Sequence, residues 1–389
     1  MGEYTVKDLQ ILTPAEHCRR RPGMYVGETT NPSPIFNEAF DNAIDEVSGG
    51  HSDICQVFLD YLNDEYTVID HGRGFPQGSI DDPNTGKSME AVELLCTTPF
   101  SGGKFGGEGY RISSGLNGVG NLVTNSMSES MEVSTWRDDR LVDLKMSRGE
   151  TESVEYVDHD DEIFSLLLDI SDQFDLDTTE AREILAKRVE ERNAEITNDE
   201  IISKNELLSE SGTRVTFKPD KEIWDTIEVP QSHVEMRCRT ASAFGMKTTL
   251  RVRNRKSDHF VPVDVSADIF DLLPPSDEGV SEYYKHSFEV CDQNTGEHVS
   301  VALQYTSDTK SYYRGYTNLL YNSQGGTHIK MLESAIYDAW SRFNIPDIKW
   351  NDIYLGLRGV VAVFISHTEF SSQSKERLTV NKSYLESLR

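Results

Sequence analysis

The stretch that most constrains the fold is residues 36–47, which has two different faces. Apolar side chains recur at helical spacing and form one stripe: Phe36, Phe40, Ala43, Ile44 and Val47. Glu38, Asn42 and Asp45 follow the same spacing on another face. A carboxylate with a side-chain amide one turn away can hold a hydrated Mg²⁺ and polarise a water molecule. For a helix that stands alone, a solvated polar face is the alternative.

The bulk properties favour a soluble globular protein. The chain has 389 residues, enough for two or three domains, and 37% of them are hydrophobic. No apolar run approaches the roughly 20 residues that cross a bilayer, and the N-terminus lacks a signal-peptide core. We therefore expect a cytoplasmic protein that makes no membrane contact. Five scattered cysteines without a C-x-x-C pair argue against a disulfide framework or a zinc site.

The net charge of −28 is unevenly distributed. So acidic a chain would repel a polyanion, which makes tight DNA binding by this chain alone unexpected. Residues 150–210 hold 20 acidic and 5 basic side chains, about half of the excess. Capping boxes beginning at Asp177 and Thr197 predict helices there. We read this region as a solubilising helical insertion, with a protein-docking or DNA-mimicking surface as the alternative.

Residues 237–256, by contrast, contain seven basic side chains and no acid. Arg251, Arg253 and Arg255 alternate along a predicted strand, so all three are expected to project from one face. They either neutralise the acidic body of the protein or contact a DNA segment.

Two local patterns near the N-terminus predict secondary structure. Thr13, Pro14 and Glu16 form a capping box with proline at the first helical position, so a helix is expected to begin there. Residues 54–62 and 66–70 are apolar, β-prone runs that predict a hairpin. Further along, strands are expected within 131–146, 211–217, 301–305, 315–321 and 360–365. Helices are expected over 89–97, 121–128 and 328–343.

The segment from Asp70 to Pro76 places a carboxylate at the end of the hairpin, before two glycines. Such backbone lets a flat ligand approach closely, and a carboxylate accepts a hydrogen bond from the exocyclic amine of adenine. Taken alone, Asp-x-Gly-x-Gly is also an ordinary turn.

Two glycine-rich loops follow. Residues 101–107 carry a single cation, Lys104, and residues 113–120 lead into a predicted helix. Glycine-rich backbone that enters a helix N-terminus offers N–H groups to phosphate oxygens. A Walker-type loop ending at Gly86-Lys87-Ser88 is rejected, because Asp81 stands where its first glycine would be.

In this order, the motifs resemble the N-terminal ATPase region of type IIA DNA topoisomerases, the DNA gyrase B and topoisomerase IV B family within the GHKL superfamily. The resemblance rests on eight stretches: residues 21–27, 38–46, 70–76, 102–105, 115–120, 212–213, 325–328 and 373–375. It implies an α+β fold, a GHKL (Bergerat) sandwich of mixed β-sheet and helices followed by an α/β transducer domain. The expected domains are 1–220, with a dimerisation arm at 1–20 and the acidic insertion at about 150–210, and 221–389.

The resemblance also implies roles for single residues. Glu38 matches the general base, Asn42 the Mg²⁺ ligand, and Gln373 and Lys375 the loop that senses the γ-phosphate. Arg137 matches the residue at the rim of the pocket that contacts aminocoumarin inhibitors. The implied ATP-binding residues are Tyr4, Asp41, Asn42, Asp45, Asp70, Arg73, Gly74, Pro76, Lys104, Gly115, Leu116, Asn117, Gly118, Val119, Gly120 and Thr213.

By this resemblance, the chain is an ATP-hydrolysing clamp with ATP and Mg²⁺ as cofactors. Its expected partners are a second copy bound through the N-terminal arm, a DNA-cleaving Toprim subunit or domain, and duplex DNA, in the bacterial nucleoid or a phage-infected cell. Because no Toprim sequence follows Lys375, we expect a fragment or a phage-type split subunit. Asn117, Ser374 and the prolines before Glu38 depart from the family pattern. A non-catalytic nucleotide-binding module and another GHKL ATPase, such as a MutL-like protein, are the alternatives.

Overall fold

The computed structural model describes most of the chain as two compact units. The described residues are 11–81, 88–102, 118–137, 140–158, 211–257, 259–343, 349–372 and 375–386, with positions 9 and 86. The first unit comprises described residues up to 102, from 118 to 233 and from 249 to 263; the second comprises those from 234 to 248 and from 264 onwards. No helix within these ranges is long and apolar enough to cross a membrane.

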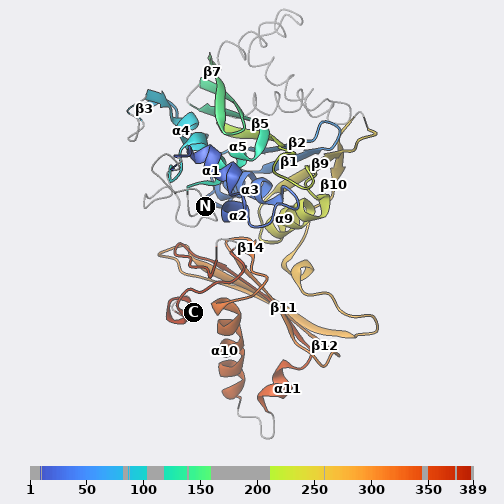
Figure 1. The fold of residues 1–389 in the computed structure, drawn as a ribbon. Helices are drawn as coiled ribbons and strands as arrows, with labels where there is room; N and C mark the ends of the chain where they lie inside the picture. The colour runs from blue at the N-terminus through green and yellow to red at the C-terminus, as the bar shows by residue number, and fades with distance from the viewer. Residues whose placement is uncertain are drawn as a thin grey trace, which may run out of the picture. The chain divides into compact units, whose positions relative to one another are not determined.

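The first unit is built on a large sheet (Figure 1). Its strands are β1 (Cys55–Asp60), β2 (Glu65–Asp70), β5 (Ser128–Arg137), β6 (Arg140–Ser147), β7 (Glu150–Asp158), β8 (Gly212–Pro219), β9 (Thr248–Arg253) and β10 (Val261–Val263). Among the described residues their order is β10-β9-β1-β2-β8-β5-β6-β7. The predicted hairpin of β1 and β2 is confirmed, with Cys55 opposite Asp70. The predicted strands at 131–146 and 211–217 are confirmed as well.

The first unit also contains helices. They are α1 (Pro14–Arg20), α2 (Gly23–Val26), α3 (Ser33–Ser48), α4 (Ala91–Thr97) and α5 (Gly120–Ser126), with a small hairpin of β3 (Ser79–Asp81) and β4 (Ser88–Glu90). The capping box of Thr13 and Glu16 is present at α1, as predicted. The side chains of Phe36, Phe40 and Ile44 on α3 are buried, and α3 packs on β1, β2 and α5.

A fully buried carboxylate, Asp220, joins distant parts of the first unit. Its Oδ2 accepts hydrogen bonds from Arg19 of α1 at 2.9 Å and from Arg148 of the β6–β7 turn at 2.7 Å. Its Oδ1 accepts the backbone N–H of Glu222 at 2.9 Å. Burial alone would raise the pKa of Asp220, but the bonds from Arg148, Glu222 and Arg19 outweigh it, so the pKa is lowered. The carboxylate is thus held ionised inside the protein.

We expect Asp220→Ala to lower the free energy of unfolding by about 3 kcal/mol at pH 7, because it removes the buried anion that two cations share. Because the folded-state pKa is depressed, this contribution is complete above the unfolded pKa of about 4 and is lost as pH falls through the lower folded value. Urea unfolding at pH 7 and pH 3 measures both effects. Glu222→Ala is the control: Glu222 contacts the same Arg19 from an exposed position and should cost less than about 0.5 kcal/mol. An equal cost for the two variants would contradict this account.

The second unit contains α9 (Gln231–Ala243), which begins at the boundary, and a mixed sheet. The sheet order is β11 (Glu282–Cys291), β12 (His298–Thr306), β15 (Leu357–Phe364), β13 (Tyr312–Thr317), β14 (Leu320–Tyr321). The 3₁₀ turn η2 (Ile269–Leu272) and the helices α10 (Thr327–Ser341), α11 (Trp350–Tyr354) and α12 (Lys382–Glu386) complete it. Strands β13 and β15 are parallel, whereas the other pairs are antiparallel.

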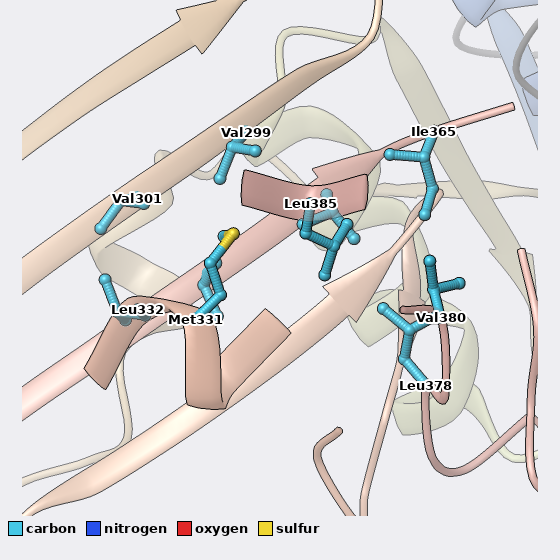
Figure 2. Packing of buried hydrophobic residues seen from close by; sticks show 10 residues of the cluster. Val299, Val301, Met331, Leu332, Ile365, Leu378, Val380 and Leu385 are labelled. Carbon is cyan, nitrogen blue, oxygen red and sulfur yellow. The ribbon is translucent and has the colours of Figure 1, made fainter. Parts of the chain in front are cut away.

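The core of the second unit lies between its sheet and helices α10 and α12. Alternate residues of β12, Val299 and Val301, point toward Met331 and Leu332 of α10 (Figure 2). Leu378, Val380 and Leu385, from the C-terminal segment, close the same cluster. The predicted helix at 328–343 and buried strand at 360–365 are confirmed.

Three expectations about local structure need correction. Residues 150–158, predicted as the start of a helical insertion, form β7, because they continue the antiparallel meander after the turn at Arg148. The remainder of that insertion, with both of its predicted helices, lies outside the described residues. The expected strand at 315–321 is divided, because Asn318 and Leu319 adopt positive φ and form the β13–β14 turn.

The third correction concerns the basic strand. Strand β9 ends at Arg253, so Arg255 lies in the following turn and does not share the strand's face. We expected this strand in the second domain, but β9 and β10 extend the sheet of the first unit next to β1. Buried Leu250 and Val252 and the Arg253–Asp60 ion pair hold it there. The division at 220/221 stays a prediction.

Candidate active site

The polar side of α3 is covered by protein. Asp41, Asp45 and Glu46 are each less than a tenth exposed, while Glu38 and Asn42 are half-buried. Because taking a carboxylate out of water is costly, four acidic side chains on one partly or fully buried helix face need a reason. A solvated polar face, the alternative for this stretch, is therefore excluded at these positions.

Glu38 lies against the first residue of α5. A Cβ atom added to Gly120 would stand 2.2 Å from Oε2 of Glu38. Glycine is thus the residue that lets the carboxylate reach the start of this helix. Asn42 lies one turn further along α3. Its Nδ2 donates a hydrogen bond at 3.0 Å to Oδ1 of Asn121, which is the residue next to Gly120. The sequence predicted Glu38, Asn42 and Gly120, but it did not single out Asn121.

The side chains around Asn42 could supply only some of the ligands that Mg²⁺ needs. The bond to Asn121 assigns Nδ2 of Asn42 as the donor, so Oδ1 is the atom that suits a hard cation. Within the described ranges, no group of three or more His, Cys, Asp or Glu side chains could hold a metal ion. Mg²⁺ keeps several waters and takes other ligands from phosphates when it binds with a nucleotide, and a role for Asn42 as its ligand stays a prediction.

We expect Gly120→Ala to lower catalytic turnover, because the new methyl group must displace the carboxylate of Glu38, the predicted general base. A displacement of about 1 Å in a catalytic group can cost about 100-fold in rate, so a 10- to 100-fold loss is expected. Steady-state nucleotide hydrolysis measures it. Gly23→Ala is the matched control: apart from its own turn of chain, no atom of the described residues lies within 4 Å of the added Cβ, and its turnover should equal that of the wild type. Wild-type turnover in Gly120→Ala would contradict the placement of Glu38.

Asp70 ends β2 and is almost fully buried. Its Oδ1 accepts the backbone N–H of Gly72 at 2.9 Å. The pKa of Asp70 is raised to about 8: burial is the main cause, the bond from Gly72 opposes the rise, and nearby Glu46 adds to it. A buried carboxylate with a raised pKa marks a functional-site candidate, because a polar ligand could hydrogen-bond to it and compensate for the burial.

Neighbouring strands place two threonines beside Asp70. Thr213 on β8 is its direct cross-strand partner, and Thr135 on β5 is the partner of Thr213. Direct partners share a face of the sheet, so the three side chains form a row. Oγ1 of Thr135 accepts the N–H of Phe75 at 2.8 Å and donates to the carbonyl of Gly212 at 3.2 Å. The sequence predicted Thr213 but missed Thr135, which only strand register could reveal.

The turn after Asp70 is packed closely against the sheet. Gly74 has φ +68, and an added Cβ would lie 2.7 Å from the carbonyl oxygen of Trp136. A non-glycine residue would therefore be strained as well as obstructed. Pro76, another predicted site residue, is exposed two residues later.

Glu46 connects α3 to this turn. Its Oε2 accepts the backbone N–H of Arg73 at 2.9 Å and Nε of Arg73 at 3.1 Å, and its Oε1 accepts Nη2 at 2.8 Å. The predicted site residue Arg73 is thus bound to Glu46, and a nucleotide contact for it stays a prediction. Glu46 was missed, because its role depends on a segment 27 residues further along the chain.

The other predicted site residues are spread over the chain. Gly118 has φ +57, and Val119 immediately precedes α5. Arg137 ends β5, and Lys375 belongs to the second unit, where its φ is +56. The following lie outside the described residues: Tyr4, Lys104, Gly115, Leu116, Asn117 and Gln373.

Two of the three arginines predicted to contact DNA are paired with acids of the first unit. Arg253 forms a two-bond ion pair with buried Asp60 and lies over the ring of Phe260 at 5.1 Å. Arg255 contacts Asp64 at 2.7 Å. These pairs favour charge neutralisation over DNA binding, and for Arg251 the DNA contact stays a prediction.

Comparison with known proteins identifies relatives across nearly the whole chain. The family model for DNA gyrase B matches residues 269–385. The type 2 topoisomerase B protein of Aquifex aeolicus is 27% identical over 388 residues, covering 97% of this chain and 42% of the relative. The mitochondrial DNA gyrase B protein of Arabidopsis thaliana is 29% identical over 396 residues, covering 96% of this chain and 47% of the relative. The chain therefore spans about half the length of these relatives.

Solved structures share the fold. The 43K ATPase domain of Thermus thermophilus gyrase B, in complex with an aminocoumarin, matches with a TM-score of 0.62 at 24% identity, covering 95% of this chain and 85% of that one. The ATPase region of Saccharomyces cerevisiae topoisomerase II matches with a TM-score of 0.61 at 14% identity. The match covers 97% of this chain and 92% of the yeast one. The predicted α+β fold is confirmed, and it is the fold of these solved ATPase domains. In sequence, the chain is similar to DNA gyrase B and type 2 topoisomerase B proteins.

Proposed function

We propose that this relative of the ATPase-bearing type IIA topoisomerase subunits binds and hydrolyses ATP and acts as the ATP-operated clamp of such an enzyme. The observation that carries the proposal is the bond network of Glu46. It fixes α3, which bears Glu38 and Asn42, to the turn that follows Asp70. The network therefore supports a site in which Glu38 serves hydrolysis and Asp70 binds the base, since both belong to the first unit.

At the base-binding end, Asp70 accepts the exocyclic amine of adenine. Thr213 lies beside it on β8, and Gly74 lets the following turn pack closely against the strands that carry this row of side chains. Guanine would present an acceptor in the same orientation and leave the buried carboxylate unpaired, which is costly. ATP is therefore preferred to GTP.

At the phosphate end, Glu38 takes a proton from the attacking water as general base. Asn42 supplies one oxygen to Mg²⁺, which when bound neutralises charge on the phosphates. Lys375 of the second unit stabilises the γ-phosphoryl group as charge shifts during transfer.

We extend the proposal to a dimer that captures a duplex DNA segment for strand passage, with DNA cleavage supplied by a Toprim-containing subunit or domain. The names of the relatives, a type 2 topoisomerase and a DNA gyrase, support the topoisomerase part of this role. The net charge of −28 implies that DNA is held by enclosure more than by affinity for this chain alone.

Binding and association experiments test this function. Isothermal titration with ATP, GTP and a non-hydrolysable ATP analogue should show preference for adenine, and light scattering should show a dimer with the analogue and Mg²⁺. ATP binding without hydrolysis would support a non-catalytic nucleotide-binding module. Absence of ATP binding would overturn the proposal.

A further inference from the structure

The segment that carries Lys375 is bound to the turn between β14 and α10. The N–H of Leu378 donates to the carbonyl of Gly325 at 3.1 Å, and the N–H and Oγ1 of Thr327 both donate to the carbonyl of Leu378 at 3.1 Å. A Cβ on Gly326 would stand 2.4 Å from that carbonyl oxygen. Residues 325–327, Gly-Gly-Thr, therefore pack closely against Leu378, three residues after Lys375, and hydrogen-bond to its backbone.

Asn322, from the same turn, holds Lys375 itself. Its side chain is 1% exposed, and its Nδ2 donates to the carbonyl oxygen of Lys375 at 2.8 Å. Oγ1 of Thr317 donates to Oδ1 of Asn322 at 2.7 Å. A hydroxyl that donates to the oxygen end of the amide directs its NH₂ group toward Lys375. The backbone N–H of Asn322 also donates to the carbonyl of Gly315 at 2.8 Å, which fixes the residue on β13.

The backbone of Lys375 needs such support. Its φ of +56 lies in the left-handed region, which a non-glycine residue adopts at a cost and keeps only when its surroundings hold it. The N–H of Lys375 donates to the carbonyl of Ser372 at 3.1 Å, so contacts fix both sides of the residue. Release of the carbonyl would let the peptide relax and would change the direction in which the lysine side chain leaves the backbone.

We propose that Asn322, oriented by Thr317, is a positioning residue that aims Lys375 for ATP hydrolysis. The inference rests on the proposed function and deepens it. Asn322 acts through Lys375, so its loss lowers kcat and leaves the affinity for ADP unchanged. Asp70 and Thr213, which serve the base, belong to the other unit.

Asn322→Asp tests the inference with little change of shape, since it replaces the donating NH₂ by an oxygen that repels the Lys375 carbonyl. We expect kcat to fall about 10- to 100-fold, with an unchanged Kd for ADP. Thr317→Val should also lower kcat, but by a smaller factor. Thr317→Ser keeps the hydroxyl and should have the wild-type kcat. Gln304→Glu is the matched control: this buried amide of β12 donates to Glu282 at 3.1 Å, so the change lowers Tm but not kcat.

A double-mutant cycle with Lys375→Ala decides how Asn322 acts. If Asn322 works through Lys375, adding Asn322→Asp to Lys375→Ala causes no further loss of kcat. Additive losses of kcat in the double mutant, or wild-type kcat in Asn322→Asp, would overturn the inference. The proposed function would still stand in either case if Lys375→Ala alone lowers kcat. Wild-type kcat in Lys375→Ala would remove the role of Lys375 and the inference with it. Should Asn322→Asp not fold, the Thr317→Val and Thr317→Ser pair decides the same question.

Discussion

Replacing Glu38 with glutamine is expected to lower the turnover number for ATP by about 10³-fold, within the range that general-base catalysis contributes. Glutamine keeps the size of the side chain beside Gly120 but cannot accept a proton from water. Affinity for ATP should remain close to that of the wild type, because Asp70 and Thr213 are unchanged. Single-turnover hydrolysis with labelled ATP, together with a binding titration, separates the two effects.

Glu132→Gln is the control for this variant. It makes the same chemical change on β5, at a half-buried position outside the site, and should leave turnover unaltered. If Glu38→Gln retained wild-type turnover, the general base would have to be a different residue. Loss of ATP binding in Glu38→Gln would instead mean that this carboxylate supports the nucleotide pocket.

Replacing Asp70 with asparagine is expected to weaken ATP binding by about 10³-fold. A site built to hydrogen-bond one substrate group loses several orders of magnitude in discrimination when that bond cannot form. Asparagine turns a carboxylate acceptor into a group whose NH₂ opposes the adenine amine. Isothermal titration of both proteins measures the difference, and binding within fivefold of the wild type would contradict the role of Asp70.

The pKa of Asp70 makes the same variant informative about pH. Burial raises the pKa to about 8, so the folded apo protein binds this proton more tightly than the unfolded chain does. The stabilising effect of the bound proton is largest at low pH and is lost as pH rises from about 4 to about 8. Adenine favours the ionised form, so ATP binding should release a proton and tighten as pH rises from 6 to 8. In Asp70→Asn this contribution to proton release should be absent.

Local patterns predicted those features that depend on neighbouring residues. The capping box at Thr13, the β1–β2 hairpin and the apolar stripe of α3 each follow from short-range spacing, and each is present. For Gly74 the turn predicted close approach by a ligand, which stays a prediction; the close contact in the structure is with the carbonyl of Trp136. These rules use one element at a time, and they worked where one element decides the outcome.

Features that depend on tertiary pairing could not be predicted in this way. Thr135 enters the row with Asp70 only through the register of β8 between β2 and β5. Asn121 and Glu46 act on segments far along the chain, and so does Asn322. Likewise, no local signal distinguishes Arg253, which neutralises a buried aspartate, from an arginine that faces a ligand. The chemistry of a side chain does not by itself predict which group the side chain will contact in the folded protein.

The central claim is that the chain hydrolyses ATP as a nucleotide-dependent dimer, and one measurement tests it most directly. This is the steady-state ATPase rate per protomer as a function of protein concentration, with Mg²⁺ and without DNA. We predict a Mg²⁺-dependent rate per protomer that rises with concentration until the dimer is saturated. Absence of Mg²⁺-dependent hydrolysis at every concentration, in protein that binds ATP, would contradict the claim.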